Sequence, residues 1–135
     1  MKRLLTITAI IEVATGLGLV GVPSVVVRLL LGSALDTSAA VTLGRVAGSA
    51  LLALGLACWL ARHDSQSRAA RGLVSAMLLY NLATAALLTF ADIGIGLHGV
   101  GLWPAVVVHA VMTIWCVVDL QRGPPNVPIN SYLQK

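Results

Sequence analysis

Charged residues are scarce in this sequence. Only 10% of its 135 residues are Asp, Glu, Lys or Arg and 4% are aromatic, whereas 58% are hydrophobic. Because this hydrophobic content is well above that of an ordinary soluble domain, the composition indicates a membrane protein. The chain also lacks a solvated basic face, so its formal net charge of +4 does not indicate binding to nucleic acid.

The residues that carry common catalytic and cofactor chemistry are also few. The two cysteines, Cys58 and Cys116, form no CxxC pattern, and no Ser/His/Asp set has the arrangement of a nucleophilic triad. The glycines of "GIGLHGVG" follow no strand, so they form no phosphate-binding loop. His98 and His109 are about 16 Å apart along a helix, too far to coordinate one ion together. We expect no metal and no cofactor, and of the possible functional classes an enzyme is the least favoured.

Four apolar runs are each long enough to cross a bilayer, which takes about 20 residues. They cover residues 4–22, 39–61, 72–91 and 100–118. The first could be a cleaved signal peptide, but Glu12 interrupts it and "GVPS" lacks the small-x-small cleavage pattern. The sequence therefore predicts an all-α, up-down four-helix transmembrane bundle over residues 1–122.

Two further segments are too short or too polar to cross the membrane. "PSVVVRLLLG", residues 23–32, predicts a short helix at the outer interface, with Arg28 contacting lipid headgroups or Asp36. Residues 123–135 contain three prolines and no apolar period, so we expect an extended cytoplasmic tail.

The positively charged residues predict the orientation of the spans. If the spans alternate, one side of the membrane holds most of them: Lys2, Arg3, Arg62, Arg68, Arg71, Arg122 and Lys135. Arg28 lies on the other side and Arg45 lies within the second span. Because Lys and Arg are retained on the cytoplasmic side, both termini should be cytoplasmic.

Glu12 is the most unusual residue of the first span. A charge at the centre of a membrane helix costs roughly 2.5–3.5 kcal/mol on insertion scales, so we expect it to face the bundle interior and find partners there. Depths estimated from a rise of about 1.5 Å per residue place Glu12, Asn81 and His109 at about 14 to 15 Å and Arg45 at about 9 Å. The sequence predicts one buried polar cluster, with a Glu12–Arg45 ion pair completed by Asn81, Tyr80 and His109.

Two interpretations of this cluster stay open. In the structural one, interhelical hydrogen bonds and small residues, such as Gly44 and Gly48 in "GRVAG", hold the bundle together. In the functional one, the five residues of the cluster form a ligand site or a proton relay, in which Glu12 and His109 exchange a proton. A free "GRVAG" face would permit a homodimer.

Several stretches resemble a family of small four-span bacterial membrane proteins of unknown function, similar in layout to the DoxX-like proteins. They are "EVATGLGL", "PSVVVRLLLG", "GRVAGSALLALGLACWLAR", "AMLLYN" and "LWPAVVVHAV". The resemblance implies a bacterial inner-membrane protein that acts as an accessory subunit of a larger membrane complex. We therefore expect a small accessory or ligand-binding subunit whose partners include the lipid bilayer.

A second resemblance supports an alternative. "AIIEV", in the first of four spans, is similar to the opening helix of small multidrug-resistance transporters, whose membrane glutamate binds protons and cationic substrates in turn. In this chain Arg45 would repel a cation. The alternative is therefore a proton-coupled transporter of a small neutral or anionic solute that uses Glu12.

Overall fold

The computed structural model describes residues 1–64 and 67–122 as a succession of five α-helices. The helices are α1 (Lys2–Gly21), α2 (Pro23–Leu31), α3 (Ser38–Ala61), α4 (Arg68–Ile95) and α5 (Leu102–Gln121). These residues contain no strand. The predicted all-helical fold is confirmed. The predicted extended tail, residues 123–135, lies outside the described residues.

Local capping explains where α3 and α4 begin and where α4 ends. The hydroxyl oxygens of Thr37 and Ser67 each accept a hydrogen bond from the backbone N–H three residues further on, at 3.1 Å. Helix α4 ends at Gly96, whose φ of +79° is the left-handed conformation common after helices. Since Ser67 and Gly96 lie beyond the apolar run 72–91, α4 is longer than that run at both ends.

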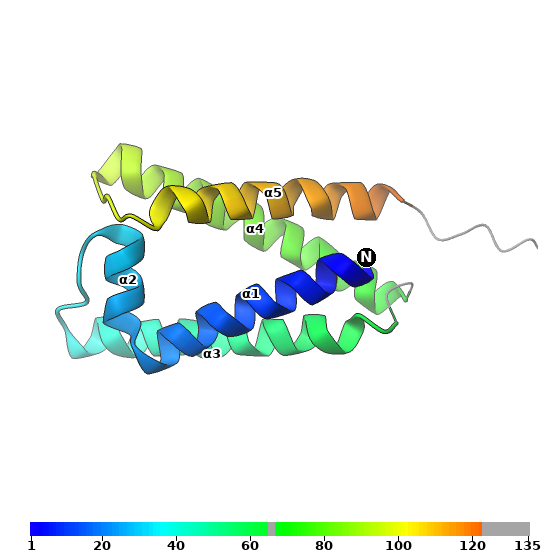
Figure 1. Cartoon of the computed structure of the whole chain (residues 1–135), viewed down its shortest axis with the longest axis horizontal. Helices are drawn as coiled ribbons and strands as arrows, with labels where there is room; N and C mark the ends of the chain where they lie inside the picture. Colours follow the sequence, from blue (N-terminus) through cyan, green and yellow to red (C-terminus); the bar gives the residue numbers. More distant parts are fainter. Residues whose placement is uncertain (65–66, 123–135) are drawn as a thin grey trace, which may run out of the picture.

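The four long helices form two antiparallel pairs, α1 with α3 and α4 with α5 (Figure 1). Glycines allow the first pair to approach closely. A Cβ atom on Gly48 would lie 2.8 Å from the carbonyl oxygen of Gly16, and one on Gly55 would lie 2.8 Å from Val13 Cγ2. Small residues at such contacts are how membrane helices come together. Gly48 of the "GRVAG" motif is therefore used inside the bundle and does not face a second copy.

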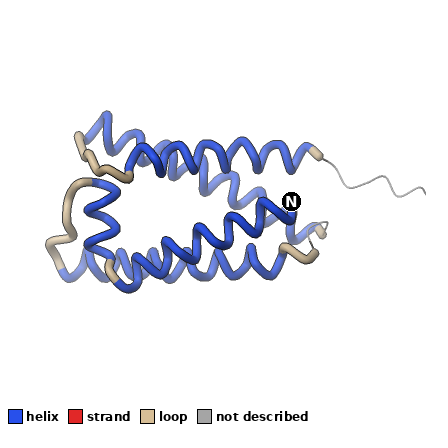
Figure 2. The backbone as a smooth tube through the Cα atoms, in the orientation of Figure 1, coloured by secondary structure: helices blue, strands red, loops and turns tan. Residues whose placement is uncertain are grey.

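The two pairs meet at the end of the bundle where α1 begins, which we call the N-terminal end (Figure 1). A buried core drawn from all four long helices closes this end. Its members are Leu4, Leu5, Ala9, Cys58, Val74, Met77, Met112 and Cys116. The pairs diverge toward the opposite end, which we call the α2 end, where α2 lies between them (Figure 2). The bundle is thus closed at one end and wedged open at the other.

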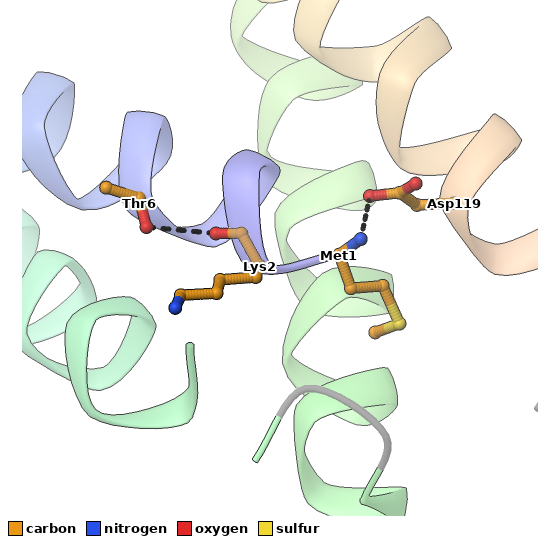
Figure 3. A network of polar contacts seen from close by, with 4 residues as sticks. All are labelled: Met1, Lys2, Thr6 and Asp119. Carbon is orange, nitrogen blue, oxygen red and sulfur yellow. Dashed lines mark hydrogen bonds and ion pairs between the residues drawn. The ribbon is translucent and has the colours of Figure 1, made fainter. Parts of the chain in front are cut away.

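Polar contacts connect the helices at the N-terminal end (Figure 3). The amino group of Met1 forms an ion pair with Asp119 Oδ2 at 2.8 Å, and both side chains are buried. Between α4 and α5, Arg71 Nη2 donates to the carbonyl oxygen of Leu120 at 3.1 Å. Helices α1, α4 and α5 are therefore held together where they meet.

Helix α2 forms the short element predicted over residues 23–32. Pro23 occupies its first turn, where the missing N–H costs no hydrogen bond, and Gly32 ends it at a φ of +73°. The N–H of Gly101 donates to the carbonyl oxygen of Leu29 at 2.8 Å, and a Cβ on Gly32 would overlap the carbonyl of His98. Helix α2 is therefore joined to α1 through Val22 on one side and docked on the loop before α5 on the other.

The outer surface of the bundle is apolar. Each of the four long helices is long and hydrophobic enough to span a membrane. Large apolar side chains are exposed along them, including Leu43, Leu56, Leu79, Leu87, Ile93 and Ile114. Such a surface is expected where lipid, not water, surrounds the protein. The chain is a small multi-pass membrane protein.

Candidate functional site

Glu12 lies inside the bundle near the middle of α1. Only 3% of its surface is exposed. Tyr80 of α4 donates its hydroxyl hydrogen to Glu12 Oε2 at 3.4 Å. No cation lies within ion-pair distance of the carboxyl group in the part of the chain that the structure describes. The glutamate therefore connects the α1–α3 pair to the α4–α5 pair through a hydrogen bond.

Asn81 and His109 form a second polar contact at the same level. Asn81 is buried on α4 and its Nδ2 donates to the carbonyl oxygen of Met77 at 2.7 Å. Its Oδ1 lies 2.8 Å from Nδ1 of His109 on α5. The rings of Tyr80 and His109 meet edge to face, with centroids 5.7 Å apart. The structure thus brings four of the five predicted cluster residues, Glu12, Tyr80, Asn81 and His109, into one layer.

Arg45 is not part of this layer, and the predicted Glu12–Arg45 ion pair is wrong. Arg45 is exposed on α3, and the ion pairs of residues 1–64 and 67–122 are Met1–Asp119 and His98–Asp92. The cause is the register of α1 against α3. Gly16 packs on Gly48, while Val13 packs on Gly55. Glu12 is therefore level with residues between about 52 and 56, which are about 7 to 11 residues and about 10 to 16 Å along α3 from Arg45.

Arg28, the predicted lipid contact, is exposed on α2. It lines a hollow of about 390 Å³ at the α2 end, together with His98 of the loop before α5. His98 is paired with Asp92 of α4. Asp36, the alternative partner expected for Arg28, makes no ion pair with it among the described residues. The guanidinium is therefore exposed at this end, and its contact with lipid headgroups stays a prediction.

A cavity of about 490 Å³ lies between the two helix pairs, and every helix contributes to its wall. Most of the lining is apolar, including Leu19, Val26, Leu30, Leu51, Leu88 and Val108. Tyr80 and His109 of the polar layer form part of the same wall. Helix α2 contributes Val26 and Leu30 to the wall. A predominantly apolar cavity of this size with a few polar groups is typical of a small-molecule site.

Thr15 and Thr84 also line this cavity, and the sequence analysis missed them. A signal was present in their spacing. Thr15 follows Glu12 by three residues and Thr84 follows Tyr80 by four, so each lies on the same helix face as a cluster residue, one turn nearer the α2 end. The hydroxyl groups extend the polar layer into the cavity.

The remaining candidate chemistry is sparse. Cys58 and Cys116 are both unbridged and fully buried in the core of the N-terminal end. Within the described ranges, no three His, Cys, Asp or Glu side chains gather in a way that could hold a metal ion. The cavity and the polar layer are therefore the features on which a function can be argued.

Fold and site together define a class: a four-span helical membrane protein with a buried polar layer near the middle of its long helices, at the base of an apolar cavity. Comparison of the chain with models of protein families, with curated proteins and with solved structures gave no match.

Proposed function

We propose that this protein is a small ligand-binding subunit of a bacterial inner membrane, and that its ligand is an uncharged, largely apolar molecule held between the two helix pairs. The observation that carries the proposal is the cavity of about 490 Å³ whose wall includes Tyr80 and His109. Its volume lies within the roughly 300–1,000 Å³ of small-molecule pockets.

The chemistry of the lining supports an uncharged ligand. None of the cavity-lining residues is Asp, Glu, Lys or Arg. Glu12 does not line the cavity. It is connected to the wall only through its hydrogen bond with Tyr80. Burying an ionised ligand without a partner of opposite charge would be costly in this apolar site. An apolar body with a hydrogen-bonding group fits both parts of the wall.

The shape of the bundle supports a cavity that persists when the protein is isolated. At the N-terminal end the helices share a packed core, but at the α2 end α2 keeps the pairs apart. Helix α2 is held in this position by the hydrogen bond from the Gly101 N–H to the carbonyl oxygen of Leu29. The docking of α2 between the two pairs therefore supports a cavity that persists.

The test fills the cavity with a side chain. Ala105 lines the cavity. Ala110, on the same helix, is exposed and lines a separate, more open apolar hollow of about 720 Å³ between α4 and α5. Native mass spectrometry of protein released gently from its own membrane should show a specific added mass in the wild type and in Ala110→Phe, and none in Ala105→Phe. A bare wild-type protein, or an added mass that survives Ala105→Phe, would contradict the proposal.

A further inference from the structure

The hydrogen-bond direction within the polar layer is fixed by Asn81. One end of its amide lies 2.7 Å from the carbonyl oxygen of Met77. A carbonyl oxygen only accepts hydrogen bonds, so the group that faces it must be the Asn81 NH₂. The amide oxygen Oδ1 is therefore the atom that faces His109.

This orientation selects the tautomer of His109. Asn81 Oδ1 is an acceptor, so the His109 Nδ1 at 2.8 Å must carry the hydrogen and donate it. In the neutral imidazole the other nitrogen, Nε2, then has a free lone pair and is an acceptor. No side-chain or backbone donor of residues 1–64 or 67–122 bonds to Nε2, and the ring lines the cavity.

Tyr80, like His109, offers a hydrogen-bond acceptor to the cavity. Its hydroxyl hydrogen is directed at Glu12 Oε2, which leaves the lone pairs of Oη for a second partner. Thr15 and Thr84, one turn nearer the α2 end, can each donate or accept, so the preference for a donor comes from His109 and Tyr80 alone. At the base of the cavity the two aromatic residues therefore both offer acceptors.

We infer that the ligand carries a hydrogen-bond donor, and that this group is the hydroxyl of an apolar alcohol or phenol, which donates to His109 Nε2. The inference rests on the proposed function and specifies the ligand class. A carbonyl or ether oxygen at the same place would face two acceptors and leave Nε2 without a partner. An ammonium group would also donate, but it would bring a charge to a wall that has no carboxylate.

The experiment compares three molecules with one carbon skeleton: cyclododecanol, cyclododecanone and methoxycyclododecane. Binding of each to the purified full chain in lipid nanodiscs is measured by competition against radiolabelled cyclododecanol, and partitioning into empty nanodiscs is subtracted. Since one hydrogen bond is at stake, the alcohol should bind about five- to tenfold more tightly than the ketone or the ether.

Two variants connect the preference to the named atom. His109→Phe retains an aromatic ring but has no acceptor. The ratio of the alcohol's affinity to the ketone's affinity should therefore fall to about one. His63→Phe is the matched control, because His63 is exposed at the N-terminal end, and its ratio should equal that of the wild type. ¹⁵N NMR of histidine-labelled protein, with the His109 signal assigned by its loss in His109→Phe, should show Nδ1 protonated and Nε2 bare.

Each outcome decides a different point. A ketone or ether that binds wild-type protein as tightly as the alcohol overturns the donor assignment and leaves the cavity as a binding site. A preference that persists in His109→Phe also overturns it. If none of the three molecules binds above empty nanodiscs, the proposed function fails and the inference fails with it.

Discussion

The imidazole ring of His109 meets the phenol ring of Tyr80 edge to face, with their planes inclined at 80°. This contact joins two hydrogen-bonded pairs, Glu12–Tyr80 and Asn81–His109, into one layer that crosses from α1 to α5. A substitution at any of the four residues should therefore affect the packing of both helix pairs.

Glu12 should be required for its shape and hydrogen bond. Glu12→Gln retains the volume and an oxygen that can accept from Tyr80, so we expect a change in unfolding free energy within about 0.5 kcal/mol. Glu12→Ala leaves a void and an unpaired hydroxyl, and should cost about 2–3 kcal/mol. Unfolding by SDS in mixed micelles measures both. Equal losses in the two variants would show that the carboxyl group itself is needed.

Glu12 and Arg45 should be energetically independent. Arg45 is exposed and level with a different part of α1, so Arg45→Leu alone should change stability by less than about 0.5 kcal/mol. The double variant Glu12→Ala/Arg45→Leu should then equal the sum of the single variants to within about 0.5 kcal/mol. If removing Arg45 instead restored stability to Glu12→Ala, the two residues would be an ion pair after all.

Gly48 should tolerate no side chain. A Cβ there would lie 2.8 Å from both the Gly16 carbonyl oxygen and Leu19 Cβ, so Gly48→Ala should destabilise the bundle by about 1–3 kcal/mol. Gly72→Ala is the matched control, because a Cβ at Gly72 meets nothing within 4 Å. It should be neutral or stabilising by up to about 1 kcal/mol, through helix propensity alone.

The docking of α2 should depend on Gly99. A Cβ at this position would overlap the carbonyl of Leu30, so Gly99→Ala should push α2 away from the loop before α5. Hydrogen exchange of the α2 amides should then become faster, while that of α1 and α3 is unchanged. Gly21→Ala lies beside α2 but meets nothing within 4 Å, and should exchange like the wild type. Unaltered α2 protection in Gly99→Ala would contradict this account.

The orientation predicted from Lys and Arg can be tested at two loops. In a background without Cys58 and Cys116, a membrane-impermeant maleimide should label Asp36→Cys in intact cells, because the α2 end is expected to be external. Asp64→Cys at the N-terminal end should be labelled only after the cells are opened. The reverse pattern would show that both termini are external.

The architecture followed from composition and the spacing of apolar runs, because span length and charge are local properties of the sequence. The same is true of the level of Glu12, Asn81 and His109, since the rise per residue converts sequence position into depth. For these residues, counting from the span ends was accurate enough to bring their side chains into one layer.

Counting residues from the span end gave the wrong position for Arg45. Depth from a span end assumes that all helices start at one plane, but the glycine contacts between α1 and α3 set a register of their own. The cavity was also beyond sequence reasoning, because it arises from the angle between two helix pairs and from the docking of α2. Both depend on contacts between segments far apart in the chain.

The pairing of the helices also bears on how the chain assembles during synthesis. Helix α1 packs mainly on α3, and α4 mainly on α5. The first pair is therefore complete within residues 2–61, before α4 has left the ribosome, and can enter the bilayer as a finished hairpin-like unit. Within the polar layer, the Asn81–His109 contact forms inside the second unit, whereas the Glu12–Tyr80 hydrogen bond can form only when the two units meet.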